Sequence, residues 1–210
     1  MSRLVDGLDG VPHWAYGFGM ALRPGESQPG TFHSGPDRGR LIVRTSRQGF
    51  AATAGHDLVI EITGWSAEIT VAGDGTVTVT ARIDLSTLVV REGVGGLKPL
   101  SDRDRREIAH TARKLLDTDR QPEALFTSSS TRLTETGGTI DGTLTVRGSN
   151  QPCTVDVKET EPGHYKATTS VLQSAYGIKP YTAFFGALKL ADRVEIELDA
   201  AGWSDGSPGA

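Results

Sequence analysis

Histidines are the residues of this chain whose side chains are best suited to metal binding or proton transfer at neutral pH. The sequence holds five of them, His13, His33, His56, His110 and His164. No two lie three or four positions apart, the spacing that places two ligands on one helical face, and no HExxH pattern occurs. We therefore expect no metal site and no cofactor.

His56 lies in the segment AGHDL, directly before a predicted strand that begins at Leu58. Two interpretations stay open. In one, His56 and Asp57 hold a turn in place through hydrogen bonds. In the other, the imidazole points into the mouth of a barrel, where it contacts a ligand or acts as an acid or base.

Nucleophilic catalysis has little support in the sequence. The single cysteine, Cys153, opens an apolar segment, where a small core residue is expected, and it can form no disulfide within the chain. No serine or cysteine has neighbours that predict an activated nucleophile.

The segment REGVGGLKPLSD, residues 91–102, combines glycines, Lys98 and a helix start, as an anion-binding loop does. It lacks the pattern GxxxxGK[ST], and Glu92 and Asp102 would repel a triphosphate. We predict a loop beside a barrel entrance, in which Lys98 could still meet a single acidic headgroup.

The most aromatic stretch runs from residue 173 to 192 and contains Tyr176, Ile178, Tyr181, Phe184 and Phe185. It is too apolar for a loop that runs only over solvent. It forms either a small core beneath a long connection or the wall of an apolar ligand cavity.

Short alternating segments surround these residues and predict an antiparallel β protein. The clearest are residues 66–71 and 76–85, which a turn at Gly73–Gly75 joins into a hairpin. Between Ile62 and Ala67 the apolar positions change from even to odd across Gly64 and Trp65, which requires a bulge, a corner or a turn. Further strands are predicted at 41–45, 58–62, 140–146, 153–157, 165–171 and 194–198, with another around residues 125–126.

One helix is predicted over residues 101–117, with Ser101 as its N-cap and acidic residues in its first turn. With about eight strands and no alternation of strands with helices, the pattern favours a mainly β fold. We expect a closed or nearly closed antiparallel barrel with one helix.

The chain of 210 residues carries 22 Lys and Arg against 26 Asp and Glu, a net charge of −4. This balance argues against nucleic-acid binding. No apolar segment approaches the roughly 18 residues of a membrane span, and the amino terminus does not resemble a cleavable signal, so we expect a soluble cytoplasmic protein. We divide the chain into an irregular arm (1–38), a barrel domain (39–200) and a tail (201–210), and a homodimer stays open.

The segments that carry the most information are TVTARIDLSTL, LKPLSDRDRREIAHTARKLLDTDRQPEALFTS, GTLTVRGSNQPCTVDV and YGIKPYTAFFGALKLADRVEIEL. They resemble the YceI-like family of lipocalin-shaped barrels, and the resemblance covers residues 39–199. The resemblance implies a cavity that binds a long isoprenoid or other amphiphilic lipid chain. The lining that it implies consists of Leu58, Ile60, Val79, Ile83, Phe126, Leu144, Ile178 and Phe184, with His56 as a further ligand contact.

These patterns lead to three hypotheses. The first is a carrier or sequestering protein for a hydrophobic chain, without catalysis. The second is a cofactor-free cyclase or isomerase that acts on a polyene or polyketide in the same cavity, with His56, Tyr176 or Tyr181 as acid, base or hydrogen-bond donor. In the third, the arm presents its aromatic segment HWAYGFGMAL, residues 13–22, to a protein partner.

Overall fold

The computed structural model describes residues 29–134, 136–202 and 204–205, and the predicted arm up to residue 28 lies outside them. One α-helix is found in the described residues, α1 (Asp102–Leu116). The strands are β1 (Gly30–Ser34), β2 (Gly39–Thr45), β3 (Arg47–Gln48), β4 (Asp57–Val71), β5 (Val77–Val94), β6 (Glu123–Thr134), β7 (Gly137–Val146), β8 (Ser149–Glu161), β9 (His164–Leu172), β10 (Thr182–Ala183), β11 (Leu188–Leu190), β12 (Arg193–Ala201) and β13 (Ser204–Asp205).

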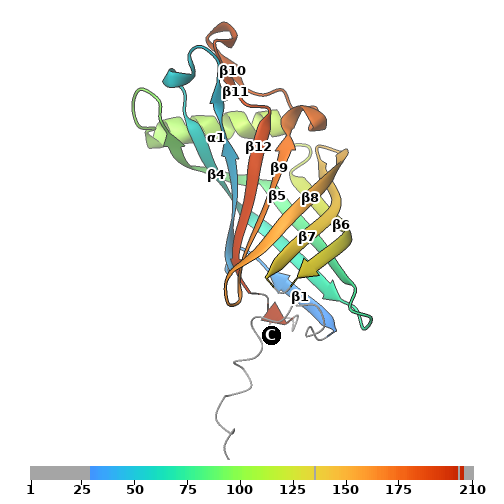
Figure 1. The fold of residues 1–210 in the computed structure, drawn as a ribbon. Helices are drawn as coiled ribbons and strands as arrows, with labels where there is room; N and C mark the ends of the chain where they lie inside the picture. Colours follow the sequence, from blue (N-terminus) through green and yellow to red (C-terminus); the bar gives the residue numbers. More distant parts are fainter. Residues whose placement is uncertain (1–28, 135, 203, 206–210) are drawn as a thin grey trace, which may run out of the picture.

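Eight antiparallel strands close into a barrel in the order β4-β2-β12-β9-β8-β7-β6-β5, and pairing of β5 with β4 completes the ring (Figure 1). Strand β1 adds to the far half of β4, and β13 adds to β1. The predicted mainly β barrel with one helix is confirmed. Because closure pairs every barrel strand on both sides, it removes the exposed edges that an open sheet would leave.

The long hairpin of β4 and β5 forms the longest strand pair of the barrel. Its turn comes after Ala72 and contains Gly75 with a φ of +83°, as the glycine-rich segment predicts. The register shifts between Ile62 and Gly64, so the irregularity that the change in apolar positions predicts is a bulge. There the amide of Gly64 donates a hydrogen bond to Thr87 Oγ1 at 2.8 Å. The bulge lets β4 turn from pairing with β2 to pairing with β1 while it stays on β5.

Several strand boundaries differ from the sequence interpretation: β4 joins two predicted strands into one, and β6 and β8 extend beyond the predicted residues. Strand β5 continues to Val94, so the predicted loop that begins at Arg91 starts four residues later in the structure, at Gly95. The end of this strand is difficult to predict from the sequence, because Gly93 has no side chain and so interrupts the alternation of apolar and polar residues. Strand β1 lies inside the segment 1–38 that the sequence assigns to an irregular arm.

Helix α1 lies across one end of the barrel (Figure 1) and confirms the predicted helix. Ser101 caps it in a reciprocal capping box with Asp104, and Asp117 ends it in the left-handed conformation. Arg113 donates hydrogen bonds to the carbonyls of Ser86 and Leu88, at 2.9 and 2.7 Å, and so fastens the helix to β5. No helix of the described residues is long and apolar enough to cross a membrane.

The interior is divided along the barrel axis into two apolar clusters. One lies at the helix end, where Ala109 of α1 packs with inward-facing residues of β2, β4 and β5, among them Leu58, Ile60, Leu88 and Val90. The other occupies the rest of the barrel and includes side chains of β4 to β9. At the helix end, a second sheet of three short strands, β10-β11-β3, lies beyond the barrel (Figure 1).

Candidate functional site: an apolar cavity inside the barrel

The barrel encloses a cavity of about 210 Å³ to which all eight strands contribute. Its lining is apolar apart from a few hydroxyl and thiol groups. The residues are Leu41, Val43, Ile62, Ala67, Ile69, Val79, Ala81, Ile83, Leu85, Ala124, Phe126, Ile140, Leu144, Val146, Cys153, Val155, Val157, Tyr165, Ala167, Thr168, Thr169, Ile196, Leu198 and Ala200.

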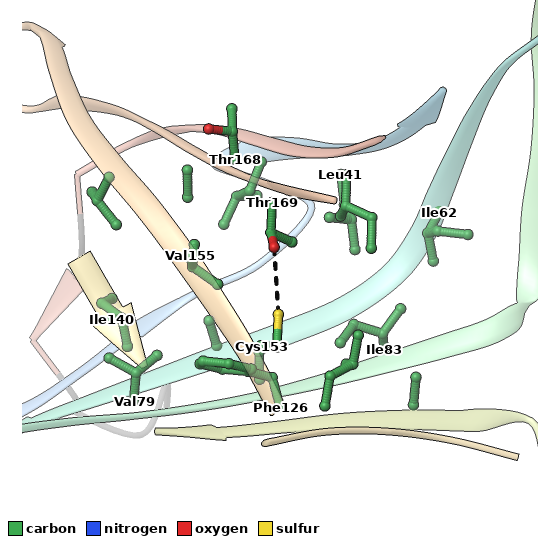
Figure 2. Close-up of a pocket in the computed structure, with 18 of the residues that line it drawn as sticks. Leu41, Ile62, Val79, Ile83, Phe126, Ile140, Cys153, Val155, Thr168 and Thr169 are labelled. Atoms are coloured by element: carbon green, nitrogen blue, oxygen red, sulfur yellow. Dashed lines mark hydrogen bonds between the residues drawn. The ribbon is translucent and has the colours of Figure 1, made fainter. Parts of the chain in front are cut away.

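The alternation of each strand explains why these residues meet. In β5 every second residue from Val79 to Leu85 lines the cavity, and in β8 Cys153, Val155 and Val157 do so. Figure 2 shows side chains from opposite walls, such as Ile62 and Ile140, around a common space. The wall is therefore a direct result of the period-two pattern in the sequence.

Two polar side chains of the wall, Cys153 and Thr169, are hydrogen-bonded to each other. Thr169 Oγ1 donates a hydrogen bond to the carbonyl of Thr154 at 2.8 Å and lies 3.4 Å from Cys153 Sγ (Figure 2). Burial raises the pKa of the Cys153 thiol. The thiol is therefore neutral at pH 7, and none of the described residues that line the cavity carries a charge.

Four of the residues in the implied lining, Val79, Ile83, Phe126 and Leu144, line this cavity. Leu58 and Ile60 also point inward but lie in the cluster at the helix end, outside the cavity wall. Ile178 is buried in the second cluster, which also contains Tyr176, and is not part of the cavity wall. The side chain of Phe184 lies outside the described part of the structure.

His56 lies in the loop before β4, half-buried and away from the cavity wall. Its Nε2 is 2.8 Å from the carbonyl oxygen of Lys98, and a Cβ on Gly96 would lie 2.2 Å from the same nitrogen. Asp57 accepts a hydrogen bond from the amide of Arg47 at 2.8 Å. These contacts match the interpretation in which His56 and Asp57 hold a turn in place.

The two candidate tyrosines do not meet His56 at one site. Tyr176 is buried in a 3-10 helix, Gln173–Tyr176, and burial, with a smaller effect of Cys153, raises its pKa to about 12. Tyr181 is exposed beside β10. A phenol with a pKa near 12 is poorly matched to proton transfer at neutral pH.

Most cavity residues are absent from the lining that the resemblance implies, including those of β2, β8, β9 and β12. The alternation would have identified them: Cys153, Val155 and Val157 are separated by two, as are Tyr165, Ala167 and Thr169. What alternation does not give is the depth of a residue along the barrel axis, which separates Leu58 from Ile62.

Other kinds of site find no support. Among the described residues, no three His, Cys, Asp or Glu side chains gather as metal ligands would. The pentapeptide Gly202–Gly206 matches GxSxG, the pattern of a nucleophile elbow. Ser204, however, lies in strand β13 and is paired with His33 of β1, whereas a nucleophile elbow places its serine at a sharp turn between a strand and a helix.

The outer surface of the barrel carries a charged groove of about 740 Å³ over β2, β4 and β12. Beside it, Glu61 accepts two hydrogen bonds from Arg40, at 3.2 and 3.1 Å, and one from Arg91 at 2.5 Å. The side chain of Glu61 is only 12% exposed, and the Arg40 hydrogen bond in particular lowers its pKa. This cluster ties β2, β4 and β5 together from outside.

The fold and cavity define a class, the lipocalin-shaped antiparallel barrels with a hydrophobic interior. The family model described as the YceI-like domain matches residues 41–201. The chain therefore belongs to the YceI-like family, as its sequence resemblance indicates.

Solved structures of two proteins share this fold. BcnA of Burkholderia cenocepacia is 16% identical with a TM-score of 0.52, over 76% of this chain and 94% of that protein. A mutant YceI protein of Campylobacter jejuni, crystallised with a monobromobimane guest, is 11% identical with a TM-score of 0.51, over 70% and 84% of the two chains. No curated protein matches the chain. At these identities the likeness shows the fold alone.

Proposed function

We propose that this protein binds one hydrophobic or amphiphilic chain, an isoprenoid or lipid, in the barrel cavity as a carrier or sequestering protein. The observation that carries the proposal is the uncharged wall, in which Cys153, Tyr165, Thr168 and Thr169 supply the only polar side chains among the described lining residues. Such a wall offers a charged or strongly polar ligand no partner for its buried groups, and burial without a partner is costly.

The energetics favour an apolar chain. Removing apolar surface from water contributes about 25 cal/mol per Å². The cavity of about 210 Å³ is smaller than most small-molecule pockets, which measure roughly 300–1,000 Å³. A slender chain suits this volume better than a bulky ring system does, and a polar headgroup would stay outside the wall.

We do not extend the proposal to a cyclase or isomerase. His56, Tyr176 and Tyr181 are separate from the cavity wall, so they are not placed to transfer a proton to a ligand within it. The polar groups of the cavity wall are a neutral thiol and hydroxyl groups, and the hydroxyl of Thr169 already donates its proton to a backbone carbonyl.

The first experiment is native mass spectrometry of freshly purified protein, with solvent extraction and identification of any co-purifying molecule. Binding is then measured with a fluorescent polyprenyl or fatty-acyl probe. We expect a one-to-one complex with the probe, and no binding of a charged, fully polar analogue of similar size.

A matched pair of variants on β5 tests the place of binding. Ile83 lines the cavity and Thr78 is exposed, so Ile83→Glu should weaken probe binding by at least about tenfold, while Thr78→Glu should leave it unchanged. Because a charge inside the barrel can also unfold it, Ala81→Phe fills the same space without a charge and should block the probe as well. Unchanged affinity in folded Ile83→Glu and Ala81→Phe proteins would show that the probe binds elsewhere.

A further inference from the structure

Three loops at the helix end of the barrel carry large apolar side chains that are exposed to solvent. Phe50 and Phe185 are fully exposed, and Leu97 is 83% exposed. Phe50 comes after β3, Leu97 comes after β5, and Phe185 lies between β10 and β11. Single exposed apolar residues are common on protein surfaces, but three at the tips of neighbouring loops are a feature that needs a cause.

Hydrogen bonds join the three loops into one structural unit. The amide of Ala51 donates to the carbonyl of Ala187 at 2.9 Å, which links the loop of Phe50 to that of Phe185. Arg47 Nη1 donates to the carbonyls of Gly55 and Val94, at 2.7 and 3.0 Å. The bond to Val94 links the loop of Phe50 to the loop of Leu97. We call the segments 46–56, 94–101 and 173–191 the apical loops; they lie at the end where Figure 1 labels β10 and β11.

The backbone at Phe185 is unusual. Its φ is +55° and its ψ is +33°, a left-handed conformation that is uncommon for a bulky side chain. The next residue, Gly186, has a φ of +88°. The strain is not compensated by burial of the ring, because the side chain is fully exposed. Strained residues of this kind are concentrated at functional sites.

The charges of the apical loops differ from those of the whole chain. The three segments contain Arg47, Lys98, Lys179 and Lys189 and no Asp or Glu, whereas the chain has a net charge of −4. One aspartate directly follows each segment, and two of the three, Asp57 and Asp192, accept hydrogen bonds from the loop backbone. The three lysines are exposed. Arg47 lies 3.9 Å from Asp57, so the lysines are the main source of positive charge that solvent can reach.

We propose that the apical loops dock this protein on the surface of an anionic lipid bilayer. Phe50, Leu97 and Phe185 would insert between the headgroups, and the lysines would meet lipid phosphates, as in other interfacial proteins. The three apolar side chains lie on separate loop tips. A lipid bilayer is fluid and can close around each of them, whereas a protein partner would need a separate pocket for each. The inference concerns the outer surface and holds whether or not the cavity is filled.

Vesicle flotation of the full chain tests this proposal, with vesicles of phosphatidylcholine and of equal parts phosphatidylcholine and phosphatidylglycerol. We expect co-flotation with the mixed vesicles and binding at least about tenfold weaker to phosphatidylcholine alone. The triple variant Phe50→Ser, Leu97→Ser, Phe185→Ser should bind the mixed vesicles at least about tenfold more weakly. Phe50→Ser alone repeats the test if the triple variant melts at a lower temperature.

Two exposed strand lysines give a matched charge control. Lys189 lies on β11 in the apical loops, and Lys158 lies on β8 away from them. Lys189→Gln should weaken binding to the mixed vesicles by roughly fivefold, and Lys158→Gln should leave it unchanged. The proposal is overturned if the wild type floats with neither vesicle, or if the serine variant binds as well as the wild type. It is also overturned if light scattering shows a dimer that the serine substitutions abolish, because the loops would then bind a second copy of the chain.

Discussion

The thiol of Cys153 donates a hydrogen bond to the hydroxyl oxygen of Thr169 inside the barrel. The two atoms lie 3.4 Å apart, and the direction is set because the hydroxyl proton of Thr169 is already donated to the carbonyl of Thr154. The only cysteine of the chain is therefore a neutral, buried thiol on the cavity wall. It can serve as a chemical reporter of that space.

We expect Cys153 to react slowly with maleimide at pH 7, because the thiolate is the reactive form and burial raises the thiol pKa. A bound hydrophobic probe should slow the reaction further by covering the wall. The rate is measured by mass spectrometry with and without the probe, and protein unfolded in urea gives the rate of a free thiol. Equal rates with and without a saturating probe would place that probe outside the cavity.

His56→Gln should change the affinity for a hydrophobic probe by less than about tenfold, since one hydrogen bond contributes about 1 kcal/mol and the imidazole is bonded to Lys98 away from the wall. Product analysis over hours accompanies the binding assay. A product formed by the wild type and lost in His56→Gln would favour the enzyme hypothesis over the carrier.

Glu61→Gln should lower the free energy of unfolding by about 1–2 kcal/mol at pH 7, because it weakens the hydrogen bonds with Arg40 and Arg91. The folded pKa of Glu61 lies below its ordinary value of 4.5. Its contribution is therefore fully present above that value and is lost as the pH falls through the folded pKa.

Urea unfolding of the wild type and Glu61→Gln from pH 7 down to pH 3 measures this dependence. The difference between the two proteins should be constant near neutral pH and shrink in acid. A difference that grows as the pH falls contradicts the lowered pKa.

Leu88 and Leu97 form a matched pair for the core at the helix end. Leu88 is 1% exposed beneath α1, and Leu97 is 83% exposed on a loop tip. Leu88→Ala should destabilise the protein by about 2–5 kcal/mol, and Leu97→Ala should stay within about 0.5 kcal/mol of the wild type. Both are measured by chemical unfolding, and similar losses would mean that Leu97 packs against something in solution.

Local patterns allowed much of the fold to be predicted from the sequence. The change of apolar positions around Gly64 predicts the bulge in β4, and Ser101 predicts the start of α1. Strand β1 could not be predicted in this way, because five residues in a segment rich in glycine and proline show no clear period. Its pairing with β4 is a tertiary contact that only the closed barrel provides.

The cavity was harder to predict than the barrel. Alternation tells that Leu58, Ile60 and Ile62 all face inward, but only Ile62 reaches the cavity, because side chains beneath α1 fill the interior around the other two. The packing of a helix across one end of a barrel depends on three-dimensional contacts between distant segments. The aromatic stretch 173–192 also contains residues of similar type with different burial, since Tyr176 is buried and Phe185 is exposed.

Strand β12 completes the barrel wall between β9 and β2, with Glu195 paired to both Ser170 and Arg44. A strand near the carboxyl end therefore joins a strand near the start of the domain. During synthesis on a ribosome the wall must stay open until residues 193–201 have emerged, and the cavity can first exclude water at that moment. A nascent chain that stops short of β12 would present the unpaired edges of β2 and β9, which are a target for chaperones and a route to aggregation.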